Sequence, residues 1–213
     1  MKPCLSRSTL AGLALLALPL MAAAQTSACE TALQNAAYTL GANPDEARLS
    51  CDIDRAAGIR DRARQIYGLR FDSMVEIIDT ASPSGAAYVY NVLADDGKLT
   101  LDARSVPDGK GPRCRLQVPL AEDKANELTT LLSSASDPSV PGYGPREDVT
   151  INPDGSRSVR LVFDSHDIIT RAETAVGARN FSRHSGSDDP VSRLNNLVIG
   201  IANVSPGWVC NAS

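Results

Sequence analysis

The sequence predicts an α+β fold, in which an N-terminal disulfide-linked helical hairpin precedes antiparallel β-hairpins with two packed helices. Three observations support this prediction. Apolar residues recur at helical spacing over most of residues 25–68. Two turn sequences, at 96–97 and 152–155, each lie between apolar runs with a period of two. Helical spacing returns after each of these hairpins, at 121–134 and 189–205.

Residues 1–24 have the features of a secretory signal peptide. Two basic residues precede an apolar run at 10–21, and the alanines at 22–24 supply a cleavage site before Gln25. The apolar run is too short to cross a bilayer comfortably. We therefore expect a periplasmic or secreted protein that has no contact with the membrane once the signal peptide is removed. A short N-terminal anchor that is never cut is the alternative.

The charge of the chain restricts its partners. The sequence has 21 basic and 25 acidic residues, a net charge of −4, and cleavage would remove two of the basic residues. This acidic balance argues against nucleic acid and against an anionic membrane surface as partners. It permits another protein as partner without selecting one. We expect the helical hairpin at 25–68 and the α+β domain at 69–213 to form one compact unit.

Cysteine usage agrees with export. Of the 5 cysteines, Cys4 would leave with the signal peptide, and the mature chain keeps Cys29, Cys51, Cys114 and Cys210. An even number in an exported chain predicts two disulfides, which can pair in three ways. The antiparallel helices place the first two cysteines within reach of each other, which favours Cys29–Cys51 and leaves Cys114–Cys210. None of these cysteines forms a Cys-x-x-Cys pattern, so the sequence supports neither a zinc site nor redox chemistry.

The N-terminal hairpin is predicted from its capping residues. Ser27 and Glu30 form a capping-box pattern, and Gly41 is a natural helix end. Asn43 and Pro44 then start a second helix, with asparagine as the cap and proline at the first helical position. The short link makes the two helices antiparallel neighbours. The apolar stripe of the second helix consists of Leu49, Ile53, Ala56, Ala63 and Ile66.

The strand region begins with a predicted strand at 71–80. Strands at 88–94 and 99–106 flank Asp96-Gly97, a strong hairpin signal, and a strand at 114–118 follows. A two-residue loop predicts a register that puts apolar pairs on one face and a polar pair on the other. The predicted pairs are Ala94 with Leu99, Val92 with Leu101, Tyr90 with Ala103, and Asn91 with Asp102.

The second half of the chain shows the same order of a hairpin and then a helix. A helix at 121–134 is followed by a loop rich in proline and glycine at 137–148. The sequence at 152–155, Asn-Pro-Asp-Gly, predicts a second hairpin with a three-residue loop and a bulge. Two more strands, at 168–175 and 178–184, and a helix at 189–205 complete the prediction. Segments 71–134 and 149–205 thus form a weak pseudo-repeat, in pattern rather than in residue identity.

The sequence contains no complete catalytic motif. The row from Asp164 to Asp167 includes Ser165 and His166, but neighbours on an extended strand point to opposite faces, so these two side chains would not meet. The row also lacks the glycine-flanked elbow that exposes a hydrolase serine. His184, the second of the 2 histidines, lies in a sequence typical of a mobile polar loop. We therefore expect no catalytic residue, no metal site and no cofactor.

The loop at 137–148 is the best candidate for function, because loops of this length in compact domains are commonly functional or disordered. Tyr143 and Arg146 are residue types favoured at interface hot spots, and we take them as candidate binding residues. A plain proline-stiffened connector is the alternative.

Together these features favour a non-enzymatic binding protein of the cell envelope, such as an inhibitor or immunity-type protein that recognises another protein. The missing catalytic motifs, the few histidines and the small disulfide-braced domain support this hypothesis. The alternative is an envelope hydrolase that uses His166 or His184 with nearby acids. A histidine packed against an acid and a nucleophile inside one cleft would favour the hydrolase, whereas exposed histidines would favour the binding protein.

Overall fold

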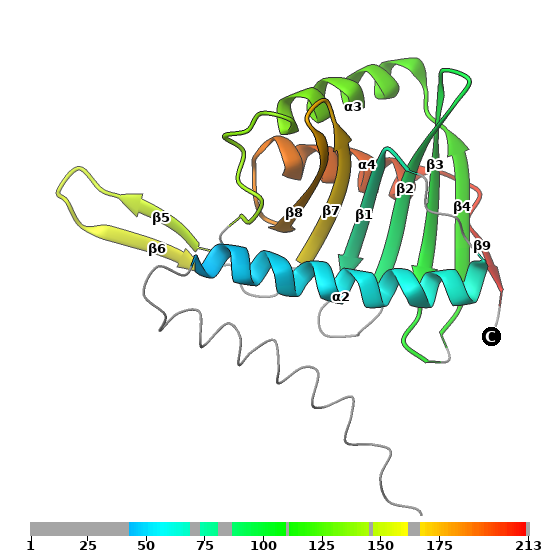
Figure 1. Ribbon diagram of the computed structural model, residues 1–213, viewed down its shortest axis with the longest axis horizontal. Coiled ribbons are helices and arrows are strands. Elements are labelled where there is room, and N and C mark those ends of the chain that lie inside the picture. The colour runs from blue at the N-terminus through cyan, green and yellow to red at the C-terminus, as the bar shows by residue number, and fades with distance from the viewer. Residues whose placement is uncertain are drawn as a thin grey trace, which may run out of the picture. The chain divides into compact units, whose positions relative to one another are not determined.

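The structure is a computed structural model that has the predicted α+β class. The described part contains three helices, a seven-stranded antiparallel sheet and a separate two-stranded sheet (Figure 1). From Asp45 on, these elements belong to one compact unit that extends to Ser213. The signal peptide and the helix predicted at 27–40 lie outside the described residues. The described residues are 43–211 except 69–72, 81–86, 110, 145–146 and 162–166.

The strands of the large sheet are not in sequence order. In spatial order they are β8 (Gly177–His184), β7 (Asp167–Thr174), β1 (Val75–Thr80), β2 (Ala87–Asp95), β3 (Lys98–Val106), β4 (Arg113–Pro119) and β9 (Val209–Asn211). The helices are α2 (Pro44–Tyr67), α3 (Glu122–Ala135) and α4 (Pro190–Val204). The hairpin of β5 (Glu147–Ile151) and β6 (Arg157–Leu161) forms the two-stranded sheet, so the second half of the pseudo-repeat differs from the first, whose hairpin joins the large sheet.

The β2–β3 hairpin has the predicted register. Ala94 lies opposite Leu99, Val92 opposite Leu101, Tyr90 opposite Ala103, and Asn91 opposite Asp102. Asp96 and Gly97 have φ angles of 47° and 75°, which is the left-handed backbone that a type I′ two-residue turn requires. Turn chemistry and apolar alternation therefore specify the same pairing, and that prediction is confirmed.

The two faces of the sheet are covered unequally. One face packs against α3 and α4 around a core that includes Val75, Ile77 and Leu101. The other face meets α2, which runs across the strands (Figure 1). Ile78 and Val106 contact α2, and both lie near the C-terminal ends of their strands. This helix therefore covers one end of the strands, and the groove described below opens beside it.

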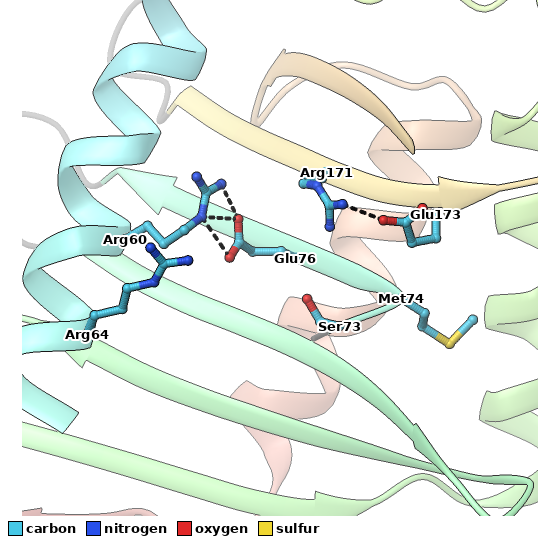
Figure 2. Close-up of a pocket in the computed structure, with 7 residues that line it drawn as sticks. All are labelled: Arg60, Arg64, Ser73, Met74, Glu76, Arg171 and Glu173. Carbon is cyan, nitrogen blue, oxygen red and sulfur yellow. Dashed lines mark hydrogen bonds and ion pairs between the residues drawn. The ribbon is translucent and has the colours of Figure 1, made fainter. Parts of the chain in front are cut away.

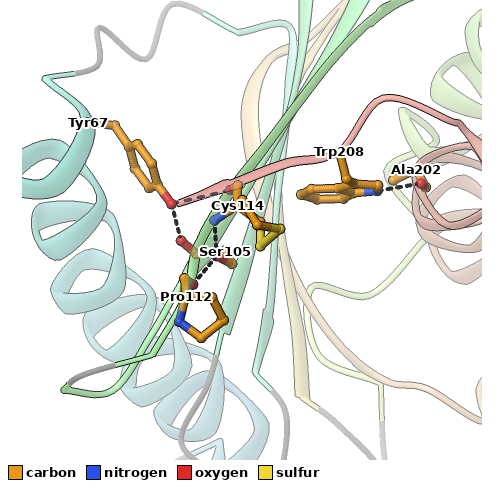
Figure 3. Close-up of a disulfide and its surroundings, with 7 residues drawn as sticks. Tyr67, Ser105, Pro112, Cys114, Ala202 and Trp208 are labelled. Atoms are coloured by element: carbon orange, nitrogen blue, oxygen red, sulfur yellow. Dashed lines mark hydrogen bonds between the residues drawn. A yellow bond between two sulfur atoms is a disulfide. The ribbon is translucent and has the colours of Figure 1, made fainter. Parts of the chain in front are cut away.

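A disulfide attaches the short last strand to the sheet. Cys114 on β4 and Cys210 on β9 are bonded, with 4.0 Å between their Cα atoms, and this is the pairing that the sequence favours (Figure 3). Cys51 on α2 is disulfide-bonded as well. Its predicted partner, Cys29, lies outside the described residues, so the Cys29–Cys51 pairing stays a prediction.

The segment after α3 has the irregular backbone of the loop predicted at 137–148 as far as residue 144, and it is attached to β8. Gly144 N donates to Ser182 O at 2.9 Å, and Ser182 N donates to Gly142 O at 2.8 Å, so this segment runs along β8. Tyr143 forms an isolated parallel bridge with Ser182, and β5 begins at Glu147. The predicted loop therefore ends two residues early, where β5 begins, and the sequence contained no sign of the attachment to β8.

Two arginines of β8 explain this attachment. Arg179 donates to the carbonyl oxygens of Ala135, Asp137 and Val140 at 3.0, 2.8 and 2.7 Å. Arg183 donates to those of Pro141 and Gly142 at 2.8 and 3.0 Å. The carbonyl groups of the segment are therefore satisfied by side chains from a strand about forty residues later in the chain.

Candidate functional site

A polar groove of about 520 Å³ opens between α2 and the uncovered end of strands β1 and β7 (Figure 2). A cavity of this volume is within the usual range of ligand-binding sites. The lining residues are Arg60 and Arg64 of α2, Ser73 and Met74 just before β1, Glu76 of β1, and Arg171 and Glu173 of β7.

The inner end of the groove is an ion pair between the helix and the sheet. Arg60 Nε lies 2.8 and 3.0 Å from the two carboxylate oxygens of Glu76, and its Nη2 atom also bonds this carboxylate. The Glu76 side chain is 3% exposed and that of Arg60 is 22% exposed. The hydrogen bonds to Glu76 raise the pKa of Arg60, although burial opposes them. The guanidinium therefore stays charged.

The outer end of the groove is a second ion pair, on β7. Arg171 and Glu173 are two residues apart on the same strand, so their side chains share a face of the sheet. The Arg171 guanidinium and the Glu173 carboxylate form an ion pair. The β1–β7 register places Arg171 directly opposite Glu76. Positive and negative groups thus alternate from α2 across β1 to β7 (Figure 2).

One hydroxyl in the groove, that of Ser73, has no partner among the described residues. Ser73 is 5% exposed, and its Oγ atom makes no hydrogen bond in the described structure. A buried hydroxyl without a partner costs about 1–3 kcal/mol, which a ligand that bonds it recovers. The neighbouring backbone is fixed, because Glu173 N donates to the Met74 carbonyl oxygen at 2.8 Å. The groove therefore combines fixed charges with one unused hydrogen-bonding group.

This lining suits binding better than proton transfer. Both carboxylates, Glu76 and Glu173, are bonded to arginines, and none of the lining residues is a histidine or cysteine. A general base needs a lone pair that points to the substrate and a pKa matched to the working pH. The groove instead presents paired charges in a defined order, and such an order can complement an opposite pattern of charge.

His184 does not lie in a mobile loop as predicted. It is the last residue of β8, it is 3% exposed, and its Nδ1 atom accepts a hydrogen bond from Gly186 N at 3.2 Å. It lies opposite Asp167 in the β7–β8 register, and Ser182 is two residues before it on the same face. The strand predicted at 178–184 agrees with β8 and already includes His184, so only the overlapping loop prediction was wrong at this residue.

The surroundings of His184 meet only part of the criterion for a hydrolase, which is a histidine packed against an acid and a nucleophile inside one cleft. An acid and a serine are nearby, but Ser182 is 2% exposed and its hydroxyl donates to Asp52 Oδ2 at 2.5 Å. Arg55 bonds Asp52 and also donates to Asp167 Oδ2 at 2.8 Å. These contacts connect α2 to β7 and β8 and give the serine a partner other than the histidine. His166 lies outside the described residues.

Of the two candidate binding residues, the structure describes Tyr143, which is largely buried. Tyr143 is 9% exposed, with the Arg48 guanidinium 5.7 Å from the centre of its ring. The backbone on either side of Tyr143 is hydrogen-bonded to β8, which explains this burial, and the binding role of Tyr143 stays a prediction. Arg146 lies outside the described residues, and its binding role stays a prediction.

Gly144 is required for this attachment. A Cβ atom at Gly144 would lie 2.5 Å from Arg183 Cδ, and the buried Arg183 side chain is held by several hydrogen bonds and cannot move away. We expect Gly144→Ala to lower the free energy of unfolding by about 1–3 kcal/mol, as overpacking does. Urea denaturation measures this loss.

Gly58 supplies the matched control. It lies within α2, and a Cβ atom there would meet nothing within 4 Å. Gly58→Ala is therefore expected to stabilise the protein by about 0.5–1 kcal/mol through helix propensity. Equal effects of the two substitutions would contradict the packing of Gly144 against Arg183.

Comparisons of the chain with family models, with curated proteins and with solved structures find no match. The helices of the described part are all too short or too polar to cross a membrane. Within the same residues, no three histidine, cysteine or acidic side chains are grouped so that they could hold a metal ion.

Proposed function

We propose that the protein is an exported, non-enzymatic binding protein of the cell envelope that recognises another protein, in the manner of an inhibitor or immunity-type protein. The polar groove beside α2 is the recognition surface in this proposal. The disulfide between Cys114 and Cys210 supports export, because structural disulfides persist in oxidising compartments such as the periplasm and the extracellular space.

The buried Ser73 hydroxyl carries the proposal. It has no hydrogen-bond partner in the described structure and lies among charged side chains that are already paired. A protein segment that enters the groove can bond this hydroxyl while its own charges meet those of the rim. The rim charges belong to Arg64, Arg171 and Glu173, whose side chains are 52%, 37% and 46% exposed.

Site-specific photo-crosslinking in cells tests the proposal. A photoreactive amino acid replaces Glu173 at the groove or, as a control, Arg193 on α4, which is likewise exposed and ion-paired. We expect a defined crosslinked protein, identified by mass spectrometry, from the groove position and not from the control. Identical products from both positions, or none from the groove, would refute the groove as a protein-binding surface.

A charge swap then separates pattern recognition from general charge attraction. Exchanging the partners of the rim pair (R171E/E173R) keeps the net charge and an ion pair but reverses the order of charges. We expect the crosslink to weaken roughly tenfold or more, since like charges then face each other across the interface. The matched swap of the pair between Asp188, just before α4, and Arg193 (D188R/R193E) is expected to leave the yield unchanged.

A further inference from the structure

A second pocket lies at the C-terminal end of α2 and has a different character. Its volume is about 330 Å³, at the lower end of the range for small-molecule sites. Three of its lining residues are arginines, and none carries a carboxylate. The lining consists of Ile66 and Tyr67 of α2, Arg104 of β3, Arg113 and Arg115 of β4, and Val209 and Asn211 of β9.

The three arginines converge because of strand register. Arg113 and Arg115 are two residues apart on β4 and therefore share a face of the sheet, and Arg115 lies directly opposite Arg104 on β3. Arg104 is already engaged, because it donates to both carboxylate oxygens of Asp102 at 2.7 and 2.8 Å. Its guanidinium also lies 5.0 Å from the centre of the Tyr67 ring.

Arg113 and Arg115 are the unused charges of this pocket. Both are exposed, and neither makes an ion pair or hydrogen bond through its side chain in the part of the chain that the structure describes. Two uncompensated guanidinium groups in one pocket are unusual in a chain with a net charge of −4. Because their mutual repulsion is relieved by an anion, the pair favours a negatively charged ligand.

The remaining walls of the pocket are held in place. The Tyr67 hydroxyl lies 2.7 Å from the carbonyl oxygen of Ser105 and 3.2 Å from that of Cys114, which fixes the ring (Figure 3). The disulfide joins Cys114 to Cys210, and the same strand pairing sets Arg113 opposite Asn211. The arginines are thus presented on a rigid frame, with an amide beside them and apolar groups at the edge.

We propose that this pocket binds a small anion of the phosphate class, such as a phosphate monoester. Planar guanidinium groups form paired hydrogen bonds with the oxygens of phosphate, and the Asn211 amide supplies a further donor. Tyr67, Ile66 and Val209 provide apolar walls for the organic part of the ligand. This site is separate from the polar groove and does not depend on the proposed function.

Titration of the purified, disulfide-bonded protein tests the proposal. The probes are inorganic phosphate, inorganic sulfate and glycerol 3-phosphate, followed by calorimetry and by NMR shifts of the arginine and asparagine side chains. We expect saturable binding and shifts at Arg113, Arg115 and Asn211. R113Q/R115Q should weaken binding about tenfold or more, since charge-assisted hydrogen bonds are lost.

Matched variants distinguish a built site from bulk charge. K98Q/R193Q removes the same charge at exposed positions outside both pockets and should leave the affinity within about twofold of the original. R113K/R115K keeps the charge but lacks the guanidinium fork, and intermediate affinity is expected. Circular dichroism and thermal unfolding confirm that each variant is folded. Equal weakening by R113Q/R115Q and K98Q/R193Q would overturn the proposal.

Vesicles identify the source of the phosphate group. The protein is sedimented with vesicles of phosphatidylcholine alone and of phosphatidylcholine mixed with phosphatidic acid. Binding to the mixed vesicles that is lost in R113Q/R115Q assigns the site to a lipid headgroup, whereas binding of the soluble probes alone assigns it to a free phosphate compound. Absence of binding to every probe would overturn the proposal.

Discussion

Replacing Arg183 by alanine (R183A) is expected to lower the free energy of unfolding by about 3–5 kcal/mol, because it breaks a buried ion pair and leaves its other partners unsatisfied. The Arg183 side chain is 0% exposed, and its Nε atom donates to Asp189 Oδ2 at 2.5 Å. Asp189 is also the N-cap of α4, where its other oxygen accepts from Ser192 N at 2.7 Å. One side chain thus connects β8, the start of α4 and the 141–144 segment.

The expected loss of stability exceeds that for replacing an ordinary surface arginine, because Arg183 has further hydrogen-bond partners. Arg183 also donates to the carbonyl oxygens of Pro141, Gly142 and Ser182, at 2.8, 3.0 and 2.8 Å. Without the guanidinium these groups have no replacement donor unless water enters the cavity. Guanidinium chloride denaturation gives the free energy of unfolding.

R193A is the control for R183A. Arg193 forms an ion pair with Asp188, but the two side chains are 62% and 78% exposed. Solvent screens a pair this exposed, so R193A should be far less destabilising than R183A. If R183A were no more destabilising than R193A, the described role of the buried arginine would be wrong.

The same ion pair predicts a dependence on pH. Burial alone raises the pKa of Asp189, but the Ser192 N–H and the Arg183 guanidinium outweigh burial and hold this pKa below its usual value. A carboxyl group with a lowered pKa stabilises the fold above its unfolded pKa, and that stabilisation is lost as the pH falls through the folded value. The stability difference between the original protein and R183A should therefore narrow as the pH falls below about 4. A constant difference over this range would contradict the assignment.

Local patterns in the sequence predicted the β2–β3 hairpin because everything that determines it lies within a few residues. Asp96 and Gly97 select the turn, and alternation of apolar residues selects the face. The N-cap and proline at the start of α4 are local in the same sense. These features needed no knowledge of the rest of the fold.

The groove could not be predicted in this way, because its residues meet through a crossover. Glu76 faces Arg171 only because β7 inserts beside β1, ninety-five residues later in the chain. The sequence did contain one signal, since Glu76 interrupts a run of Val and Ile in a buried strand. A charge in such a position requires a partner. The partner on α2, Arg60, follows from packing and not from the local pattern.

The segment at 137–148 shows what a local pattern leaves out. Its proline and glycine content predicted a loop, but it could not show that this loop is attached to β8. The missing information was the set of hydrogen bonds from Arg179 and Arg183, which follow the segment by about forty residues. Glycine served close packing at Gly144 rather than flexibility.

Removing the Cys114–Cys210 disulfide (C114A/C210A) is expected to lower the free energy of unfolding by about 4–5 kcal/mol in the chain-entropy description, because the bond closes a long loop in the unfolded chain. The two cysteines are separated by 96 residues, so the loop includes α3, β5 to β8 and α4. The double variant is preferable to reduction, since Cys51 is disulfide-bonded as well and reduction would break both bonds. Urea denaturation measures the change.

The folded structure should survive removal of the Cys114–Cys210 disulfide. This expectation distinguishes the C114A/C210A variant from R183A. Trp208 lies between α4 and β9, packs against the main core, and donates through Nε1 to the carbonyl oxygen of Ala202 at 3.0 Å (Figure 3). We therefore expect the fluorescence of Trp208 before unfolding to remain that of the original protein while the urea midpoint falls. The strand β9 itself has only three residues, all exposed, and two of them, Val209 and Asn211, line the second pocket. A loss below about 1 kcal/mol would show that closing this loop contributes little to stability, contrary to the entropy argument.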